Sequence, residues 1–235
     1  SHYRDSGLIM RAMILAAGRG ERMRPLTDRT PKPLLSVGGK TLIDYHIDGL
    51  KRAGFQDIVI NNAWLGEQVR AHVGDGSRFG VRVTHSDERP AALETGGGIH
   101  RALPLLGAEP FLVVNGDVWT DLPFANLRHA LGANDFAHFV MVPNPPQHQR
   151  GDFALCNGRV CEEGEPRYTF SGVGVYRPEF FEGCEPGAFK LVPLMVQAMR
   201  ANRVSGELYE GRWFDIGTPE RLARLDEQLS TVSTS

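Results

Sequence analysis

The stretch AMILAAGRGERMRPLT, residues 12–27, places an apolar run directly before two glycines and three arginines. A short apolar run of this kind is typical of a buried strand. Small residues after a strand let a ligand approach the main chain, whose N–H groups bind anions. The third glycine of a dinucleotide-binding fingerprint and the Gly-Lys-Ser/Thr of a Walker loop are both missing. The stretch therefore predicts a strand followed by another kind of phosphate-binding loop, with an ordinary βα turn as the alternative.

The charges of the chain nearly cancel. Its 235 residues include 26 basic and 28 acidic side chains, which give a net charge of −2, and 41% of the residues are hydrophobic. This balance provides no global field for nucleic acid or an anionic membrane, so we expect small-molecule partners only. No apolar run approaches the roughly 20 residues of a membrane-spanning helix. Three cysteines without zinc-ligand spacing fit a reducing compartment, and the expected location is the cytoplasm.

Short apolar runs alternate with helical spacing over residues 10–142, which is typical of a doubly wound, mainly parallel sheet in an α/β fold. Strands are predicted at 13–17, 57–61, 81–85 and 111–115. Helices are predicted over 42–50, 65–73 and 96–106, where apolar residues recur at helical spacing.

Residues 143–229 follow a different pattern of short strands and turn residues. The predicted elements are strands at 152–156, 168–176 and 204–209, a helix over 191–201 and a final helix from Pro219. We expect a small lobe of the same domain with C-terminal helices, because its apolar runs are too few for a core of its own. Residues 1–9 resemble a tag or extension, and the Ser/Thr-rich tail at 230–235 is expected to be disordered.

Lys32 lies between two prolines, which predict an extended, stiff backbone that aims the ammonium group. A rigidly placed cation suits a charge that develops at a fixed point. A solvated lysine in a surface turn is the alternative.

Two aspartates have sequence neighbours that suggest a metal site. Asp117 comes just past the predicted strand 111–115, at the edge where open α/β sheets bind ligands, and a carboxylate there is a natural magnesium ligand. Asp215 lies between apolar residues, where an unpaired carboxylate would be costly, so it needs a cation or a hydrogen-bond partner. A turn-capping role for Asp117 is the alternative.

A run of three glycines, Gly96 to Gly98, opens the helix predicted over 96–106. Consecutive glycines clear side chains from whatever docks there, and a flat base or a sugar would fit. A flexible loop is the alternative.

Four motifs, taken in order, resemble those of the sugar-1-phosphate nucleotidyltransferases. They are Leu15-Ala16-Ala17-Gly18-x-Gly20-x-Arg22-Met23-x-Pro25-Leu26-Thr27, Pro31-Lys32-Pro33-Leu34, Asn115-Gly116-Asp117 and Phe214-Asp215-Ile216-Gly217-Thr218. The likeness extends from residue 12 to about residue 225. It implies a Rossmann-like nucleotidyltransferase fold, with a nucleotide-binding part over 10–142 and a small sugar-binding lobe over 143–229.

The resemblance also implies a reaction, in which a sugar-1-phosphate oxygen attacks the α-phosphorus of a nucleoside triphosphate and pyrophosphate leaves. Both reactants are polyanions, so a metal and fixed cations must offset their repulsion. The implied cofactor is Mg2+, held by Asp117 and Asp215. The implied catalytic residues are Arg22 and Lys32, whereas Arg19 and Arg24 of the opening stretch remain surface charges.

The implied binding residues come from the same motifs. Those expected at the nucleotide are Ala17, Gly18, Gly20, Glu21, Arg22, Lys32, Glu94, Gly97 and Asn115. Those expected at the sugar are Asn115, Asp152 and Gly172. Many relatives carry a Glu-Lys-Pro run that Gly164-Glu165-Pro166 replaces here, so their second lysine has no counterpart, and Lys190 is a candidate substitute.

Within the family, the runs Glu94 to Gly98 and Asn115 to Thr120 resemble those of members that use UTP and N-acetylmuramate α-1-phosphate. The resemblance implies these substrates and a role in peptidoglycan recycling. Other members of the family use mannose-1-phosphate with GTP, or glucose-1-phosphate with dTTP or UTP, and these remain alternatives. A regulatory protein that keeps the fold without the chemistry is the alternative outside enzymes. The complete set of Arg22, Lys32 and the two aspartates argues against it.

Overall fold

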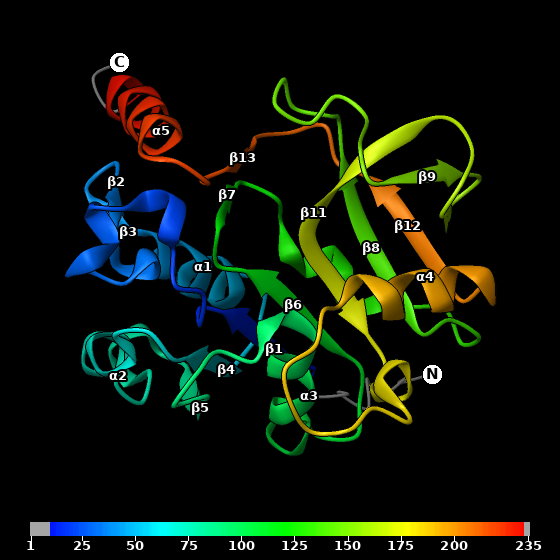
Figure 1. Cartoon of the computed structure of the whole chain (residues 1–235), viewed down its shortest axis with the longest axis horizontal. Helices are drawn as coiled ribbons and strands as arrows, with labels where there is room; N and C mark the ends of the chain where they lie inside the picture. Colours follow the sequence, from blue (N-terminus) through cyan, green and yellow to red (C-terminus); the bar gives the residue numbers. More distant parts are fainter. Residues whose placement is uncertain (1–9, 233–235) are drawn as a thin grey trace, which may run out of the picture.

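The computed structural model describes residues 10–232, whose central feature is a nine-stranded sheet (Figure 1). Its strands lie in the order β5 (Arg82–Asp87), β4 (Asp57–Asn62), β1 (Arg11–Leu15), β6 (Phe111–Asn115), β11 (Arg167–Tyr176), β8 (Ala137–Val142), β12 (Val204–Leu208), β10 (Arg159–Cys161) and β9 (Phe153–Cys156). The first four strands are parallel, β11 is antiparallel to both of its neighbours β6 and β8, and β12 is parallel to β8. The predicted α/β fold is confirmed, and the predicted parallel pairing holds for the first four strands, whereas the rest of the sheet is mixed. Residues 1–9, which we expected to be a tag or extension, lie outside the described residues.

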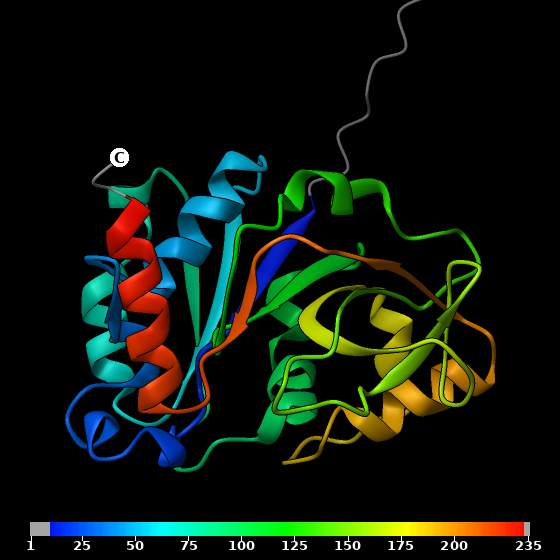
Figure 2. The same ribbon diagram turned by 90° about the horizontal axis from the view of Figure 1, so that it is seen from above.

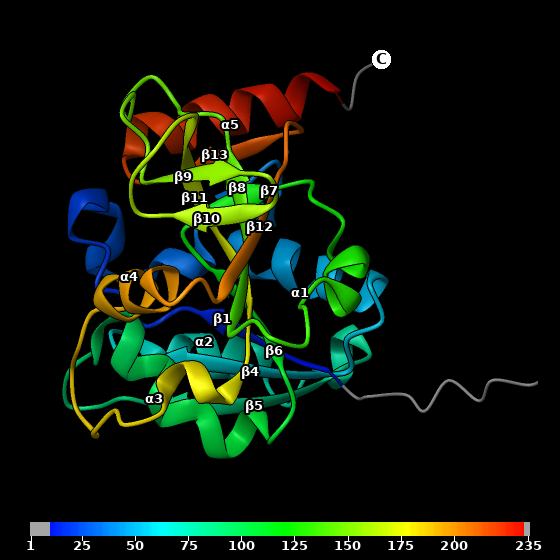
Figure 3. The ribbon, with the colours of Figure 1, turned by 90° about the vertical axis from the view of Figure 1, so that its right-hand side faces the viewer.

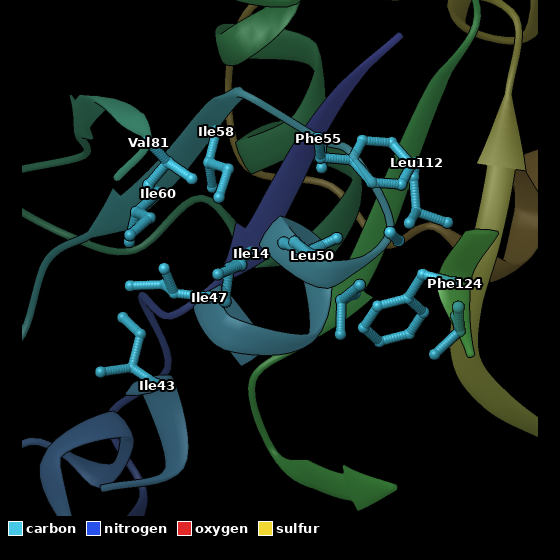
Figure 4. Close-up of a cluster of buried hydrophobic side chains, with 14 of the residues drawn as sticks. Ile14, Ile43, Ile47, Leu50, Phe55, Ile58, Ile60, Val81, Leu112 and Phe124 are labelled. Carbon is cyan, nitrogen blue, oxygen red and sulfur yellow. The ribbon is translucent and has the colours of Figure 1, made fainter. Parts of the chain in front are cut away.

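Helices cover both faces of the sheet. One face carries α1 (Leu42–Arg52) and α2 (Gly66–Val73), and the other carries α3 (Glu94–Leu106) and α4 (Val192–Arg200). Side chains of β1 alternate between the two layers, so Ile14 joins the first core and Met13 the second. Figure 4 shows the first core, in which Ile43, Ile47 and Leu50 of α1 meet apolar side chains of the strands.

The predicted helical stripe of α1 is confirmed. Its positions Leu42, Ile43, His46, Ile47 and Leu50 are all buried. The hydroxyl of Thr41 accepts a hydrogen bond from the amide of Asp44 at 3.2 Å, which caps the first turn. The local sequence therefore sets both where this helix begins and which side faces the sheet.

A segment after β12 crosses the molecule and returns the chain to the opening loop. Figure 2 shows this segment in orange, running from β12 to the red helix α5 (Pro219–Val232). Along the way β13 (Trp213–Asp215) pairs antiparallel with β7 (Val118–Thr120). Leu222 and Leu225 of α5 then pack in a third core with Met23 of the opening loop, and Figure 3 shows α5 along one side of the molecule.

Several elements differ from the predictions. Strand β6 has the predicted bounds, whereas β1 begins and ends two residues before the predicted strand 13–17. Strand β8 was not predicted, yet it lies between β11 and β12, so the parts before and after residue 142 share one sheet. The prediction of a disordered tail from residue 230 is wrong for residues 230–232, because α5 continues to Val232. Residues 233–235 lie outside the described residues.

Between residues 10 and 232, every helix is too short or too polar to cross a lipid bilayer.

Candidate active site

Two cavities meet at the carboxyl ends of β1 and β6. The larger has a volume of about 650 Å³ and the smaller about 150 Å³. Both are lined by Glu94, Thr95, Asn115 and Asp117. A ligand can therefore extend from one cavity into the other past these four residues, at the edge of the sheet where open α/β folds bind ligands.

The opening loop contributes to both cavities. Ala17 and Gly18 line the smaller one, and a side chain added at Gly18 would meet no protein atom within 4 Å. Arg22 is exposed and lines the larger one. This leaves the main chain at Gly18 open to a ligand, with a guanidinium nearby.

The other arginines fasten the loop to the protein. Arg19 stacks on the ring of Trp64 at 3.8 Å and reaches a carboxylate oxygen of Asp28 at 3.3 Å. Arg24 binds the same oxygen of Asp28 at 2.8 Å. Both side chains thus have partners within the loop region. Gly20 lies outside the lining of both cavities, and so does the exposed Glu21.

Lys32 is buried, with 5% of its surface exposed, and its ammonium nitrogen lies 3.3 Å from the Oδ1 of Asp117. The prediction of an aimed ammonium agrees with this geometry. The prediction of an extended backbone is wrong, because Lys32 begins a 3₁₀ turn that ends at Leu34. The extended residue is Pro31, whose ψ of 145° leads into the turn. The turn, held by a hydrogen bond from the amide of Leu35 to the carbonyl of Lys32, sets the side-chain direction.

Asp117 is brought to the opening loop by close packing at Gly116. The amide of Gly116 donates to the carbonyl of Leu15 at 2.9 Å. A Cβ at Gly116 would lie 2.4 Å from that same oxygen, so only glycine permits the approach. The turn after β6 is thereby held against the end of β1, where the opening loop begins.

Asp215 joins Asp117 through backbone pairing. In the ribbon of β13 and β7, Asp215 is the register partner of Val118. The amide of Ile216 donates to the carbonyl of Asp117 at 3.0 Å. Both aspartates line the larger cavity.

The two carboxylates fit a hard divalent cation. Among residues 10–232 no group of three His, Cys, Asp or Glu side chains is arranged to hold a metal by itself. Mg2+ usually takes one or two protein carboxylates and completes its shell with waters and substrate phosphates. Two carboxylates on the wall of a substrate-sized cavity match that pattern, and each is now paired with a protein cation, Asp117 with Lys32 and Asp215 with Arg221.

The glycine run at the start of α3 receives the protein's own chain. The amide of Gly97 donates to the carbonyl of Phe189 at 3.1 Å, and a Cβ at Gly97 would lie 2.2 Å from the carbonyl oxygen of Gly187. A Cβ at Gly96 would lie 2.5 Å from the Phe189 ring. The expectation that this run clears space for a base or a sugar is therefore wrong at Gly96 and Gly97, and Gly97 is buried away from both cavities.

Sequence reasoning missed two polar side chains of the smaller cavity, Asn61 and Glu88. Glu88 is 2% exposed. Its Oε2 accepts a hydrogen bond from the side-chain nitrogen Nδ2 of Asn61 at 2.7 Å, and its Oε1 accepts one from the backbone amide of Leu93 at 2.9 Å. Asn61 closes the predicted strand 57–61, and Glu88 follows β5. Asp117 was predicted because it is a polar residue at the carboxyl end of a strand, and the same criterion also selects Asn61 and Glu88.

The expected sugar residues line the larger cavity. The Asp152 carboxylate is held by the ring of His148 at 2.9 Å and by the amide of Phe170 at 2.8 Å. Gly172 packs on Asn115, since a Cβ there would lie 2.7 Å from the Asn115 Cβ. Lys190 lies in the same lining, so the structure brings it to one cavity with Asp152 and Gly172.

A glycine-containing loop open to a ligand, beside two carboxylates and a buried lysine, is the arrangement expected of an enzyme that transfers a nucleotidyl group. Residues 11–153 match the model of the nucleotidyl transferase family, and the chain belongs to that family. It is 54% identical to an N-acetylmuramate alpha-1-phosphate uridylyltransferase of Neisseria meningitidis serogroup B, over 91% of this chain and 95% of that protein. A protein of the same name from Caulobacter vibrioides is 36% identical, over 93% of this chain and 96% of its own.

A solved structure shows the same fold. A Bacillus anthracis protein crystallised with sucrose superposes with a TM-score of 0.84 at 21% identity, covering 94% of this chain and 95% of its own. The expected fold and the expected class of enzyme, a nucleotidyltransferase, are therefore both confirmed.

Proposed function

We propose that this protein transfers UMP from UTP to N-acetylmuramate α-1-phosphate, in the recycling of peptidoglycan. A phosphate oxygen of the sugar-1-phosphate attacks the α-phosphorus of UTP. The bond from that phosphorus to the oxygen bridging to the β-phosphorus breaks, and pyrophosphate leaves with the electron pair. The names and coverage of the two bacterial relatives support this choice of substrates.

The observation that carries the proposal is the contact of the buried Lys32 with Asp117, which lines both cavities and lies next to Asp215 in the ribbon of β7 and β13. Lys32 and Arg22 would neutralise the phosphates and the charge that builds on the α-phosphate. Fixed cations in a site that excludes water cost no reorganisation during the reaction. Asp117 and Asp215 would hold the magnesium ion, which supplies further charge neutralisation on the phosphate oxygens.

The smaller cavity would take the uracil and ribose, alongside Ala17, Gly18 and Glu94. Glu88 is a buried carboxylate in the lining of this cavity, and its two oxygens accept hydrogen bonds from Asn61 and Leu93. Uracil offers one N–H donor on its pairing edge, at N3. Each carboxylate oxygen of Glu88 can accept a further hydrogen bond, so this side chain would favour a base with a donor at this position.

The larger cavity would take the sugar-1-phosphate. Asp152 and the main chain at Gly172 would bind hydroxyl groups, with Asn115 between sugar and nucleotide. Lys190 would contribute a positive charge near the sugar phosphate. This assignment compensates for the lysine that Glu165 replaces, because Lys190 is a cation in the lining of that cavity.

A panel of substrates tests the proposal. Each of five nucleoside triphosphates is combined with N-acetylmuramate-, mannose-, glucose- and N-acetylglucosamine-1-phosphates and magnesium, and pyrophosphate release is measured. We expect UTP with N-acetylmuramate α-1-phosphate to give the highest kcat/KM. A different best pair would overturn the substrate assignment within the family, in favour of GTP with mannose-1-phosphate or of dTTP or UTP with glucose-1-phosphate. No release from any pair would favour the regulatory binding protein.

A further inference from the structure

The guanidinium group of Arg221, near the start of α5, forms an ion pair with the carboxylate of Asp215. Its Nη1 lies 2.8 Å from the Asp215 Oδ2, and its Nε lies 3.3 Å from the Thr218 hydroxyl. The Arg221 side chain is 22% exposed. The pair is thus partly shielded, and the hydroxyl of Thr218 orients the guanidinium toward the carboxylate.

Gly217 allows a second guanidinium to come close. A Cβ at Gly217 would lie 2.6 Å from Nη2 of Arg221 and 3.1 Å from Nη2 of Arg22. Two guanidinium groups therefore converge over this glycine, beside the carboxylate of Asp215. Like charges are costly at such proximity, so the arrangement favours an anion between or above them.

A guanidinium and a divalent cation compete for the same oxygen of Asp215. Asp117 is likewise paired, with Lys32 at 3.3 Å. A metal ion that arrives alone must displace a cation and also meets the repulsion of the neighbouring positive charges. A metal ion that arrives on a triphosphate brings negative charge, which gives the displaced guanidinium a new partner.

We propose that Arg221 is a displaceable counterion of Asp215, which leaves the carboxylate when metal and nucleoside triphosphate bind together and then contacts phosphate beside Arg22. The protein consequently binds free metal weakly and the metal–nucleotide complex strongly. This inference rests on the proposed function, because it assigns a role to a residue beside the same metal and triphosphate.

The structure leaves room for the displaced side chain. A further cavity of about 390 Å³ shares Trp213 and Asp215 with the larger cavity, and its lining includes Arg221 and Arg224. Arg221 can change its rotamer next to this space without unpacking α5, whose core contacts are made by Leu222 and Leu225. Arg224 also faces this cavity but is not among the residues that pair with Asp215, which makes it a matched control.

The test is the affinity for Mn2+, measured by electron paramagnetic resonance on the full chain without nucleotide. Removing an ion pair of this exposure frees the carboxylate, which is expected to raise the affinity for Mn2+ by about fivefold. Arg221→Gln should therefore bind Mn2+ about fivefold more tightly than the wild type. Arg221→Lys should stay close to the wild type because it keeps the charge, and Arg224→Gln should be unchanged. Equal Mn2+ affinity in wild type and Arg221→Gln would overturn the proposal.

A second measurement uses a non-hydrolysable UTP analogue with Mn2+. Here Arg221→Gln should bind the complex about fivefold more weakly than the wild type, since it has lost a phosphate contact. Tighter binding in both measurements would overturn the transfer of Arg221 to phosphate. Neither measurement involves turnover, so their failure is distinct from the failure to release pyrophosphate that would overturn the proposed function.

Discussion

The carbonyl of Asp117 accepts a hydrogen bond from the amide of Ile216, at 3.0 Å, so the backbone itself ties Asp117 to its neighbour Asp215. The two aspartates come from the crossing segment and from the turn after β6, which are distant in sequence. Their separation is set by a two-stranded ribbon, not by flexible side chains. A single ion can then be held between the middle of the chain and a part near its end.

Removing both carboxylates should abolish metal-dependent pyrophosphate release. We expect Asp117→Asn and Asp215→Asn each to weaken Mn2+ binding, and the double variant to show no activity at any magnesium concentration. Asp48→Asn is the control, because Asp48 is a surface carboxylate that pairs with Lys40. Activity in the double variant would place the metal elsewhere.

Lys32→Ala should lower kcat by about a hundredfold or more while the protein remains folded. The loss of one preorganised charge at a transition state costs roughly 3 to 4 kcal/mol, which corresponds to that factor. Steady-state kinetics and circular dichroism measure the two quantities. Lys40→Ala removes a partly exposed lysine that pairs with Asp48 and makes no contact with Asp117, and it should keep its rate. If Lys32→Ala turned over at nearly the wild-type rate, Lys32 would not be catalytic.

Glu88→Gln should raise the KM for UTP by roughly tenfold, with a smaller change in kcat. The substitution keeps the size of the side chain but replaces one acceptor oxygen with a donor, and a mismatched buried hydrogen bond costs about 1 to 3 kcal/mol. Glu67→Gln, at an exposed glutamate of α2, is the control. An unchanged KM would mean that the base does not contact Glu88.

His46 should make the protein less stable in acid. It is 3% exposed beneath the turn at Gly116, and burial lowers its pKa from 6.5 to about 4, against a smaller opposing effect of backbone groups of Gly116 and Val118. The unfolded chain therefore binds a proton between these values that the folded protein does not. The contribution of the neutral His46 to the free energy of unfolding is fully present above pH 6.5. As the pH falls to 4, about 3 kcal/mol of it is lost.

Urea unfolding at pH 7 and pH 4 measures this effect. Between pH 7 and pH 4, the free energy of unfolding of the wild type should fall by about 3 kcal/mol more than that of His46→Gln, which carries no titratable group at this position. Equal losses in the two proteins would show that His46 keeps its ordinary pKa in the fold.

Continuous apolar runs and helical spacing were sufficient to predict the elements around the first core. Strand β6 and the buried face of α1 follow from local sequence. The strand is a continuous apolar run, and the buried residues of the helix recur at helical spacing. Strand β8 has six buried residues but was missed, since its partners β11 and β12 come later in the chain and the change of pattern at residue 143 suggested a boundary there.

At the site, the motifs predicted that Lys32, Asp117 and Asp215 act together. The structure brings the two aspartates into the lining of one cavity and places Lys32 against Asp117. The ribbon that does so could not be predicted, because β7 and β13 have three residues each and show no periodicity. The role of Gly97 was misjudged for a similar reason: the segment at Gly187 that covers it is far away in sequence. The pairing of Arg221 with Asp215 likewise depends on how α5 packs.

The most direct test of the account follows the α-phosphorus of UTP. The protein is incubated with UTP labelled at that phosphorus, N-acetylmuramate α-1-phosphate and magnesium, and the products are separated. We predict that the label appears in a UDP-sugar and that unlabelled pyrophosphate is released in equal amount. Label that remains in UTP, or appears in UMP or UDP without a sugar, would contradict the account.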